Sequence, residues 1–305
     1  MRMYTDDPQR NKGNNRANEA CGIVKKSRPS GTMSAIEQSR HSRTGFAEML
    51  DSMDKDSLLD KFKWFICERE NIRLKKEAGE PRPWTSDDIL DKCKFTNIYR
   101  QHDKVSKYIF SRCQHLDGPD LVYNLLLSRL INRVDILSKF LPTISSVDLS
   151  FLLEGDAIMM NSSAYQVSPG MVKLDSFATN RETIVHYPKK VYEDVYTAIS
   201  STDHIADAVF RGNKAFGGHI PFTMLQVVLD YHYLTGHYND DSDVPVGQGA
   251  EAIVSKLGGI NFLASTFNMK KYDVEHAACE FRKYLSREGK KLSKYSYVEN
   301  SMGVK

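Results

Sequence analysis

The sequence predicts a mainly α fold, and three observations support this prediction. Beyond residue 45, apolar residues recur with the 3.6-residue period of an amphipathic helix. Proline, glycine and polar clusters separate the periodic segments, as they do at helix ends. No segment alternates apolar and polar residues for long enough to predict an extended strand. With 305 residues, 41% of them hydrophobic, the chain can bury a sizeable core in one large domain or two.

The helices can be assigned in chain order from this period and from the residues that bound them. The segment 46–78 predicts one long helix or two shorter ones, ended by the run 79–83, which holds Gly and two Pro residues. Thr85, with Asp88 three residues later, resembles a capping box that opens a short helix. The stretch 157–188 is expected to be irregular, with short strands. Further helices are predicted over 97–113, 119–139, 147–153, 190–211, 220–234, 249–257 and 274–287.

The first 45 residues differ from the rest of the chain. They are rich in Asn, Ser, Arg and Gly and carry nine Lys/Arg against four Asp/Glu. Such a segment buries too little apolar area to offset its ordering entropy. We therefore predict a disordered basic arm over 1–45 and a helical domain over 46–305. The positive charge of this arm would favour binding to nucleic acid. A solvated tail with no partner explains the same composition equally well.

Composition and motifs exclude several classes of protein. Five cysteines form no CxxC pair and leave one over, which predicts free thiols in a reducing cytosol. No apolar run approaches the roughly 18 residues of a membrane span, and the N-terminus lacks an apolar signal core. Zinc-ligand spacing, a GxxxxGK[ST] phosphate loop and a GxSxG elbow are all missing from the sequence. We expect an intracellular protein with neither a metal nor a cofactor.

The first segment that suggests chemistry surrounds residue 100. In the predicted helix, Asn97, Arg100, Lys104 and Lys107 recur three or four residues apart on one face. Arg100 and Asp103 are i,i+3 neighbours, so the guanidinium can hold a phosphate while the carboxylate accepts a proton. An ordinary surface ion pair also explains this spacing.

The second segment is the predicted helix 220–234. Gln226 and Asp230 fall four residues apart on one face of an otherwise apolar helix. A carboxylate and an amide among apolar positions must find partners or line a cavity. A buried structural hydrogen bond or a solvated outer face would also satisfy them.

The third segment combines glycines with a basic helix end. Gly247 and Gly249 precede a predicted helix, where backbone N–H groups can approach a phosphate. This arrangement resembles a degenerate helix-hairpin-helix of the DNA glycosylase type, and a simple helix-entry turn accounts for it equally well. Arg282, Lys283 and Arg287 follow, interleaved with tyrosines, a pattern that suits a nucleic-acid backbone and an unstacked base. A solvated helix end is the alternative for these cations.

Taken in order, these segments resemble the alpha-glutamyl/putrescinyl-thymine pyrophosphorylase family. Its members are also described as amino acid:DNA transferases, and the family is related to the helical domain of hydroxymethyluracil DNA kinases. The resemblance covers roughly residues 64–297. In place of the family's usual Pro-Gly-Pro-Gly-Ala-like turn, this chain reads Pro-Val-Gly-Gln-Gly-Ala at 245–250. The motifs that carry the resemblance are Glu-Arg-Glu-Asn-Ile (68–72), Pro-Trp-Thr (83–85), Phe-Thr-Asn-Ile-Tyr-Arg (95–100) with Asp103, Gln-Val-Val-Leu-Asp (226–230), Gly-Gln-Gly-Ala (247–250) and Phe-Arg-Lys-Tyr (281–284).

The resemblance implies hypermodification of thymine in DNA, typically in bacteriophage and therefore in the host cell cytoplasm. A partner kinase would first phosphorylate 5-hydroxymethyluracil in DNA. The present protein would then displace the (pyro)phosphate with the amine of an amino acid or polyamine. The implied fold is an all-helical relative of the DNA glycosylases, consistent with a base flipped out of the duplex.

The resemblance also suggests roles for individual residues. Arg100 is expected to bind the leaving phosphate, and Asp230 or Asp103 to accept the proton of the amine. Asp230→Asn should then abolish transfer while sparing folding and DNA binding. The remaining expected roles are pyrimidine recognition by Asn97 and Gln226, base stacking by Tyr99 or Trp84, and contact with the DNA backbone by Gly247, Gly249, Arg282, Lys283 and Arg287.

Two other functions are compatible with the same residues. A glycosylase-like enzyme would excise the base and leave an abasic site. A non-catalytic accessory of the kinase would bind DNA in a salt-dependent way and leave the base unchanged.

Overall fold

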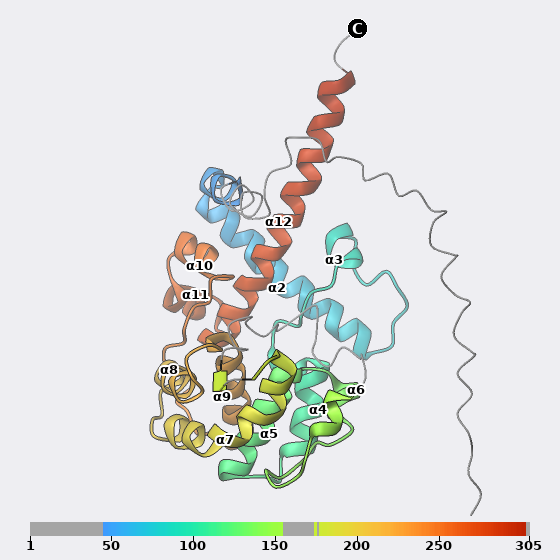
Figure 1. Cartoon of the computed structure of the whole chain (residues 1–305). Coiled ribbons are helices and arrows are strands. Elements are labelled where there is room, and N and C mark those ends of the chain that lie inside the picture. The colour runs from blue at the N-terminus through green and yellow to red at the C-terminus, as the bar shows by residue number, and fades with distance from the viewer. Residues whose placement is uncertain (1–44, 155–173, 176, 303–305) are drawn as a thin grey trace, which may run out of the picture. The chain divides into compact units, whose positions relative to one another are not determined.

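The computed structural model describes residues 45–154, 174–175 and 177–302, with side chains described as far as residue 289 (Figure 1). The predicted arm lies outside these residues except for its last position, as does most of the predicted irregular stretch 157–188. The chain divides into two units, Met1–Gly45 and Phe46–Lys305, and the second is described below. Every regular element among the described residues is a helix, which confirms the mainly α prediction.

Figure 1 shows the order of the elements after a short first helix at 45–52. They are α2 (Lys55–Glu77), α3 (Asp88–Lys92), η1 (Arg100–His102), α4 (Lys104–Cys113), α5 (Gly118–Ile131), α6 (Val134–Leu137), η2 (Ser150–Leu153), α7 (Asn180–Ser200), α8 (Ile205–Ala215), α9 (Pro221–Thr235), α10 (Glu251–Leu257), α11 (Ile260–Phe267) and α12 (Lys271–Met302). No helix in the described part of the chain is both long enough and apolar enough to cross a bilayer.

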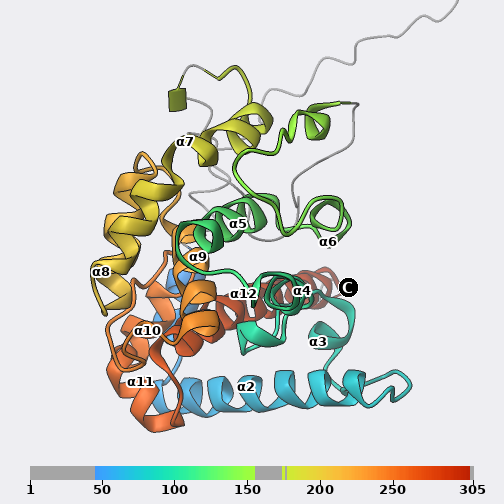
Figure 2. The same ribbon diagram turned by 90° about the horizontal axis from the view of Figure 1, so that it is seen from below.

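The buried apolar residues form two clusters. The middle core is built mainly from α4 to α9, where α5 packs on α7 and α9 and α8 packs on both of these helices. The end core joins α2 and α3 to α10, α11 and α12. In the end core, the rings of Phe62 and Phe281 lie 5.0 Å apart between centroids, so segments far apart in the sequence share one core. In Figure 2, α2, α3, α10 and α11 lie around α12, and α5, α7 and α9 lie on the opposite side of α12 from α2.

Helix α9 runs through the middle core, and its sequence explains why. Pro221 occupies the first turn, where its missing N–H costs no hydrogen bond, and Gly236 ends the helix with a φ of 67°. Ten of its fifteen residues are buried. A helix that is apolar on all sides is stable only inside a core, so any polar side chain on α9 must be satisfied there.

The segment 46–78 forms two helices, the second of the two predicted alternatives, because Asp54 caps α2 by accepting a hydrogen bond from the Ser57 N–H. Other predicted boundaries are wrong, each for a local reason. Asp87, not Thr85, caps α3, and its carboxylate accepts from two backbone N–H groups. The predicted helix 119–139 breaks at Asn132, which adopts a left-handed conformation with a φ of 50°.

The helix predicted over 97–113 starts at Lys104 instead. Asp103 precedes it with extended backbone, and η1 forms a separate short turn before that residue. The expected common face of Asn97, Arg100, Lys104 and Lys107 is therefore wrong. Helix α11 was not predicted, and α7 already begins within the stretch expected to be irregular.

Candidate functional site

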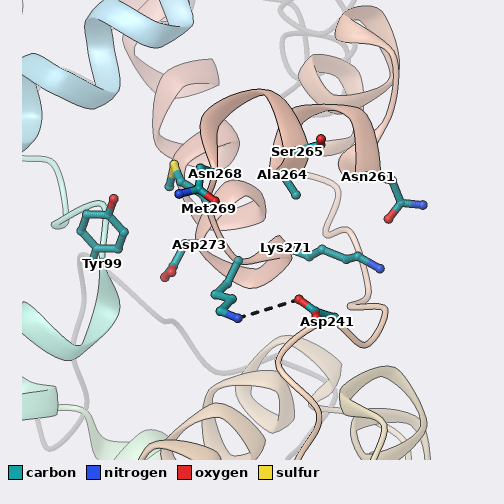
Figure 3. Close-up of a pocket in the computed structure, with 10 residues that line it drawn as sticks. Tyr99, Asp241, Asn261, Ala264, Ser265, Asn268, Met269, Lys271 and Asp273 are labelled. Carbon is teal, nitrogen blue, oxygen red and sulfur yellow. Dashed lines mark ion pairs between the residues drawn. The ribbon is translucent and has the colours of Figure 1, made fainter.

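A cavity of about 520 Å³, the Asp273 cavity, lies beside the first turn of α12. Its size is within the range of small-molecule sites. Figure 3 shows Tyr99, from the segment before η1, across from Asp273. The residues that line it include Tyr99, Asp241, Asn261, Asn268, Lys270 and Asp273.

Asp273 is a buried carboxyl in this cavity. Its side chain is 5% exposed, and Oδ1 has no hydrogen-bond partner among the described residues. Burial raises the pKa of Asp273 to about 7, against the opposing effect of Arg100. A carboxyl with this pKa exchanges protons at neutral pH, as an acid–base group must.

Arg100 is a buried positive charge near Asp273, in addition to Lys270 and Lys271 on the cavity wall. It is 3% exposed in η1, and its Cζ lies 5.9 Å from the centroid of the Phe222 ring. Burial raises the pKa values of Asp273 and Glu275, and the charge of the Arg100 guanidinium lowers both of them in part. Arg100 therefore lies within electrostatic reach of two carboxyl groups from the start of α12.

The loop that carries Arg100 is held by its own polar residues. Asp103 Oδ1 accepts a hydrogen bond from the Asn97 backbone N–H at 3.0 Å. Asn97 Nδ2 donates to the carbonyl of His102, also at 3.0 Å. Both side chains thus bridge the two ends of the turn around η1. The structure places Asn97 and Asp103 where they position Arg100.

Helix α12 holds the same loop from the other side. His276 Nε2 lies 2.9 Å from the Asn97 carbonyl oxygen, so this nitrogen must donate. The pKa of His276 is well below its ordinary value because the ring is buried and Arg100 is near. Glu280 Oε2 accepts from the Thr96 N–H at 2.9 Å. A neutral His276 thereby fixes the loop in place.

Asp230 forms a buried ion pair with Arg129. Its two oxygens accept from Arg129 Nε at 2.5 Å and Nη2 at 2.6 Å, and both side chains are 2% exposed. Arg129 also donates to Ser106 Oγ at 2.8 Å. The pair links α9 to α5 and engages both carboxylate oxygens. A base role for Asp230 requires this ion pair to open.

Gln226 and Tyr233 lie seven residues apart, two turns along one face of α9. Gln226 is 2% exposed, and its Nε2 has no hydrogen-bond partner among the described residues. The buried Tyr233 hydroxyl also has none there, and burial, with Asp273 adding to it, raises the pKa of Tyr233 far above its ordinary value. Unsatisfied buried polar groups are rare in native proteins. The Tyr233 hydroxyl and Asp273 Oδ1 lie within electrostatic reach of each other, and together they indicate a place for a polar ligand. Gln226 is not among the residues that line the Asp273 cavity.

The two aromatic candidates lie in different cavities. Tyr99 lines the Asp273 cavity, and burial raises its pKa. Trp84 lines a second cavity of about 210 Å³, the Trp84 cavity, which shares no lining residue with the first. The structure therefore does not bring Trp84 into the cavity that Tyr99 and Asp273 line.

Gly247 and Gly249 pack against α12. The Gly247 N–H donates to Glu275 Oε1 at 3.2 Å. A Cβ added at Gly249 would lie 2.5 Å from the Cys279 Sγ, so only glycine fits at this distance. Contact between the Gly247 N–H and a DNA phosphate requires release of Glu275, and the predicted DNA role of these glycines stays a prediction.

The basic residues of α12 contact neighbouring side chains. Arg282 Cζ lies 5.1 Å from the Phe46 ring centroid, and Lys283 Nζ lies 4.9 Å from that of Phe95. Arg287 Nη1 lies 3.3 Å from the Cys93 Sγ. Their DNA contacts likewise stay a prediction.

The sequence prediction missed Asp273, Tyr233 and Arg129. The run Asp-Val-Glu-His at 273–276 was the available signal, because it places three ionisable residues within four positions at the start of a helix. No group of His, Cys, Asp and Glu side chains in the described part of the chain is arranged to hold a metal ion.

Residues 56–262 match the protein family described as "5-hmdU DNA kinase, helical domain". The matched range runs from α2 into α11, and thus includes Arg100, Arg129, Gln226, Asp230 and Tyr233. Asp273 and the rest of α12 lie beyond it. No curated protein and no solved structure matches the chain.

Proposed function

The chain belongs to the family of the 5-hmdU DNA kinase helical domain, which links it to hydroxymethyluracil DNA modification, and on this premise we propose that it is a transferase. The reaction displaces (pyro)phosphate from phosphorylated 5-hydroxymethyluracil in DNA with the amine of an amino acid or polyamine. In this proposal a hydroxymethyluracil DNA kinase supplies the phosphorylated base, in a bacteriophage-infected cell.

The observation that carries the proposal is the buried carboxyl of Asp273 on the wall of a cavity of about 520 Å³, with Arg100 within electrostatic reach of it. The amine nitrogen forms a bond to the exocyclic methylene carbon, and the carbon–oxygen bond to phosphate breaks. The leaving oxygen takes the bonding electrons, and Arg100 stabilises its charge. Asp273 accepts the proton that the donor ammonium must lose before it attacks, and passes it to the released phosphate or to water.

Charges of both signs on the cavity wall suit an amino acid as the donor. Lys270 Nζ lies 3.3 Å from Asp240 Oδ2 and 3.8 Å from Asp241 Oδ1, and the dashed line in Figure 3 marks the second of these ion pairs. An amino acid can replace these partners, with its carboxylate on Lys270 and its ammonium directed to Asp273, the proposed base. A polyamine offers no group for the lysine, so we propose the amino acid as the preferred donor.

We also propose a DNA-glycosylase-like arrangement with a base flipped into the site. Two features support it. The candidate residues come from α9 of the middle core and α12 of the end core, so they lie where the two cores meet. In addition, α10 and α11 are joined only by Gly258 and Gly259, which have φ values of 108° and 96° and form a tight helical hairpin.

The test uses DNA that contains phosphorylated 5-hydroxymethyluracil, incubated with the full chain and a pool of amino acids and polyamines. Nucleosides from the digested DNA are read by mass spectrometry. We expect a nucleoside heavier by one donor, with phosphate released. Loss of the base would indicate excision, and bound but unchanged DNA would indicate an accessory. Both results contradict the transferase.

Asp273→Asn is the variant that tests the proposed base. It should retain DNA binding and lose transfer by a factor of about 100 or more, the usual contribution of a general base. Asp207→Asn, on the exposed face of α8, removes the same charge and serves as the matched control. Equal transfer by the two variants would exclude Asp273 from the mechanism.

A further inference from the structure

The Trp84 cavity, about 210 Å³ in volume, lies between α2 and the segment that contains α3. Its charged lining consists of the cations Arg69, Lys76, Arg82 and Lys94 against the single carboxylate of Asp91. None of Lys76, Arg82 and Lys94 forms a salt bridge within the described residues. The cavity therefore has an excess of positive charge without an ionic partner.

Arg69 is the buried part of this lining. Its side chain is 3% exposed, and Nη2 donates to the carbonyls of Phe95 and Thr96 at 3.2 and 3.0 Å. Its Nε has no hydrogen-bond partner among the described residues. Burial lowers the pKa of Arg69 despite the opposing carboxylates Glu280 and Asp103. A buried guanidinium with an unused donor is favourable only when an acceptor can reach it.

Lys76 and Arg82 are exposed and crowd the same tryptophan ring. Lys76 Nζ lies 4.7 Å and Arg82 Cζ 4.5 Å from the centroid of the Trp84 ring. The pKa of Lys76 is lowered by burial and by the charges of Arg69 and Arg82. Trp84 is itself fixed, because its Nε1 donates to the Glu80 carbonyl at 2.7 Å. An anion placed among these groups would relieve their mutual repulsion.

We propose that the Trp84 cavity binds a phosphate group. The cavity is smaller than a typical pocket for a whole small molecule, which favours a compact anion. Arginine and lysine together provide the fork and the point charge with which proteins hold phosphate. The phosphate comes either from the DNA backbone or from free phosphate or pyrophosphate, and the same cations recognise both.

The site is independent of the transferase proposal, since its occupancy is measured without turnover. It is nevertheless joined to the Asp273 cavity by one short segment. Arg69 binds the Phe95 and Thr96 carbonyls, and the next residues lead through Asn97 to Tyr99 and Arg100. A phosphate on Arg69 would therefore be linked, through the hydrogen bonds of Arg69, to the segment that carries Arg100, the residue proposed to stabilise the leaving group.

Calorimetric titration of the full chain tests the proposal, with sodium phosphate, sodium pyrophosphate and a short DNA duplex as probes. Lys76→Gln and Arg82→Gln should each weaken binding of the occupying probe by about tenfold, the effect of one charge-assisted contact. Lys63→Gln removes the same charge from an exposed position of α2 outside the cavity, so it should leave binding unchanged. Asp91→Asn should tighten binding, because it removes the one repulsive carboxylate and keeps its shape.

The two sources of phosphate give different results. If a free anion binds and responds to these variants, the site takes a small phosphate. If only DNA responds, with the slope of log affinity against log salt falling by about one for each cation removed, the ligand is a backbone phosphate. If Lys76→Gln and Arg82→Gln change none of the titrations beyond the Lys63→Gln control, the proposal is wrong. Unchanged thermal unfolding of the variants confirms that the comparison is between folded proteins.

Discussion

At the scale of single residues, the site depends on what surrounds each charge. Asp273 and Asp230 are both buried aspartates, yet their environments differ. Asp230 has both oxygens engaged by Arg129, whereas Asp273 has one oxygen without a partner in the described part of the chain. Burial raises the pKa of Asp273 to about 7, so Asp273 is the one suited to exchange a proton at neutral pH.

The pH dependence of transfer should follow Asp273. The ionised carboxylate is the active base, so the rate should rise with pH through about 7 and level off above it. Single-turnover rates between pH 5.5 and 8.5 measure this profile. Asp273→Asn should remove this rise as well as most of the rate. A rise that persists in the variant would assign the titration to another group.

Asp273 should also affect stability in a predictable direction. Its pKa in the folded protein is higher than the 3.8 of a free aspartate, so the folded state binds more protons between pH 4 and 7. The contribution of this residue to stability is therefore present at low pH and lost as pH rises through 7. From pH 5 to pH 8, the free energy of unfolding measured in urea should fall for the native protein relative to that of Asp273→Asn, because asparagine does not titrate. A constant difference would contradict the raised pKa.

At the scale of elements, Arg129 and Asp230 connect α5 to α9 through the middle core. Removal of one partner from a buried ion pair leaves the other charged and unsatisfied. The structure therefore revises the expectation that Asp230→Asn would spare folding. Loss of transfer in that variant would not by itself show a catalytic role.

We expect Asp230→Asn to lower the free energy of unfolding by about 3–5 kcal/mol, as measured by chemical denaturation. Replacement of both partners, Arg129→Met with Asp230→Leu, should recover a large part of this loss, because no buried charge remains. The double variant separates the two roles of Asp230. If it folds and transfers the amine, the carboxylate is structural; a single variant as stable as the native protein would contradict the ion pair.

At the scale of the whole molecule, local features were predictable and long-range ones were not. Helix α9 was predicted at 220–234 and spans Pro221–Thr235, because its proline, apolar run and glycine are adjacent in sequence. The conformation around Arg100 depends on His276, which bonds to Asn97 from 179 residues away. Asp273 becomes a candidate base only because burial in the folded protein raises its pKa to about 7, against the opposing effect of Arg100. The apolar periodicity of a single segment cannot predict a contact between residues so far apart in the sequence.

The two cores should form at different times during refolding. The middle core uses mainly residues 104–244, whereas the end core must bring α2 to α12. Closure of so long a loop is slow, because its entropic cost precedes any gain from contact. Pulsed hydrogen exchange should show amides of α5 and α9 protected before those of α2. Simultaneous protection of all helices would contradict this order.

The division of the end core between distant segments also concerns the chain during synthesis. Helix α2 leaves the ribosome long before α12 has been translated, so the apolar side of α2 that holds Phe62 and Phe65 has no intramolecular cover during that interval. The nascent protein therefore presents a ready binding surface for chaperones, and that surface closes only when Phe281 arrives.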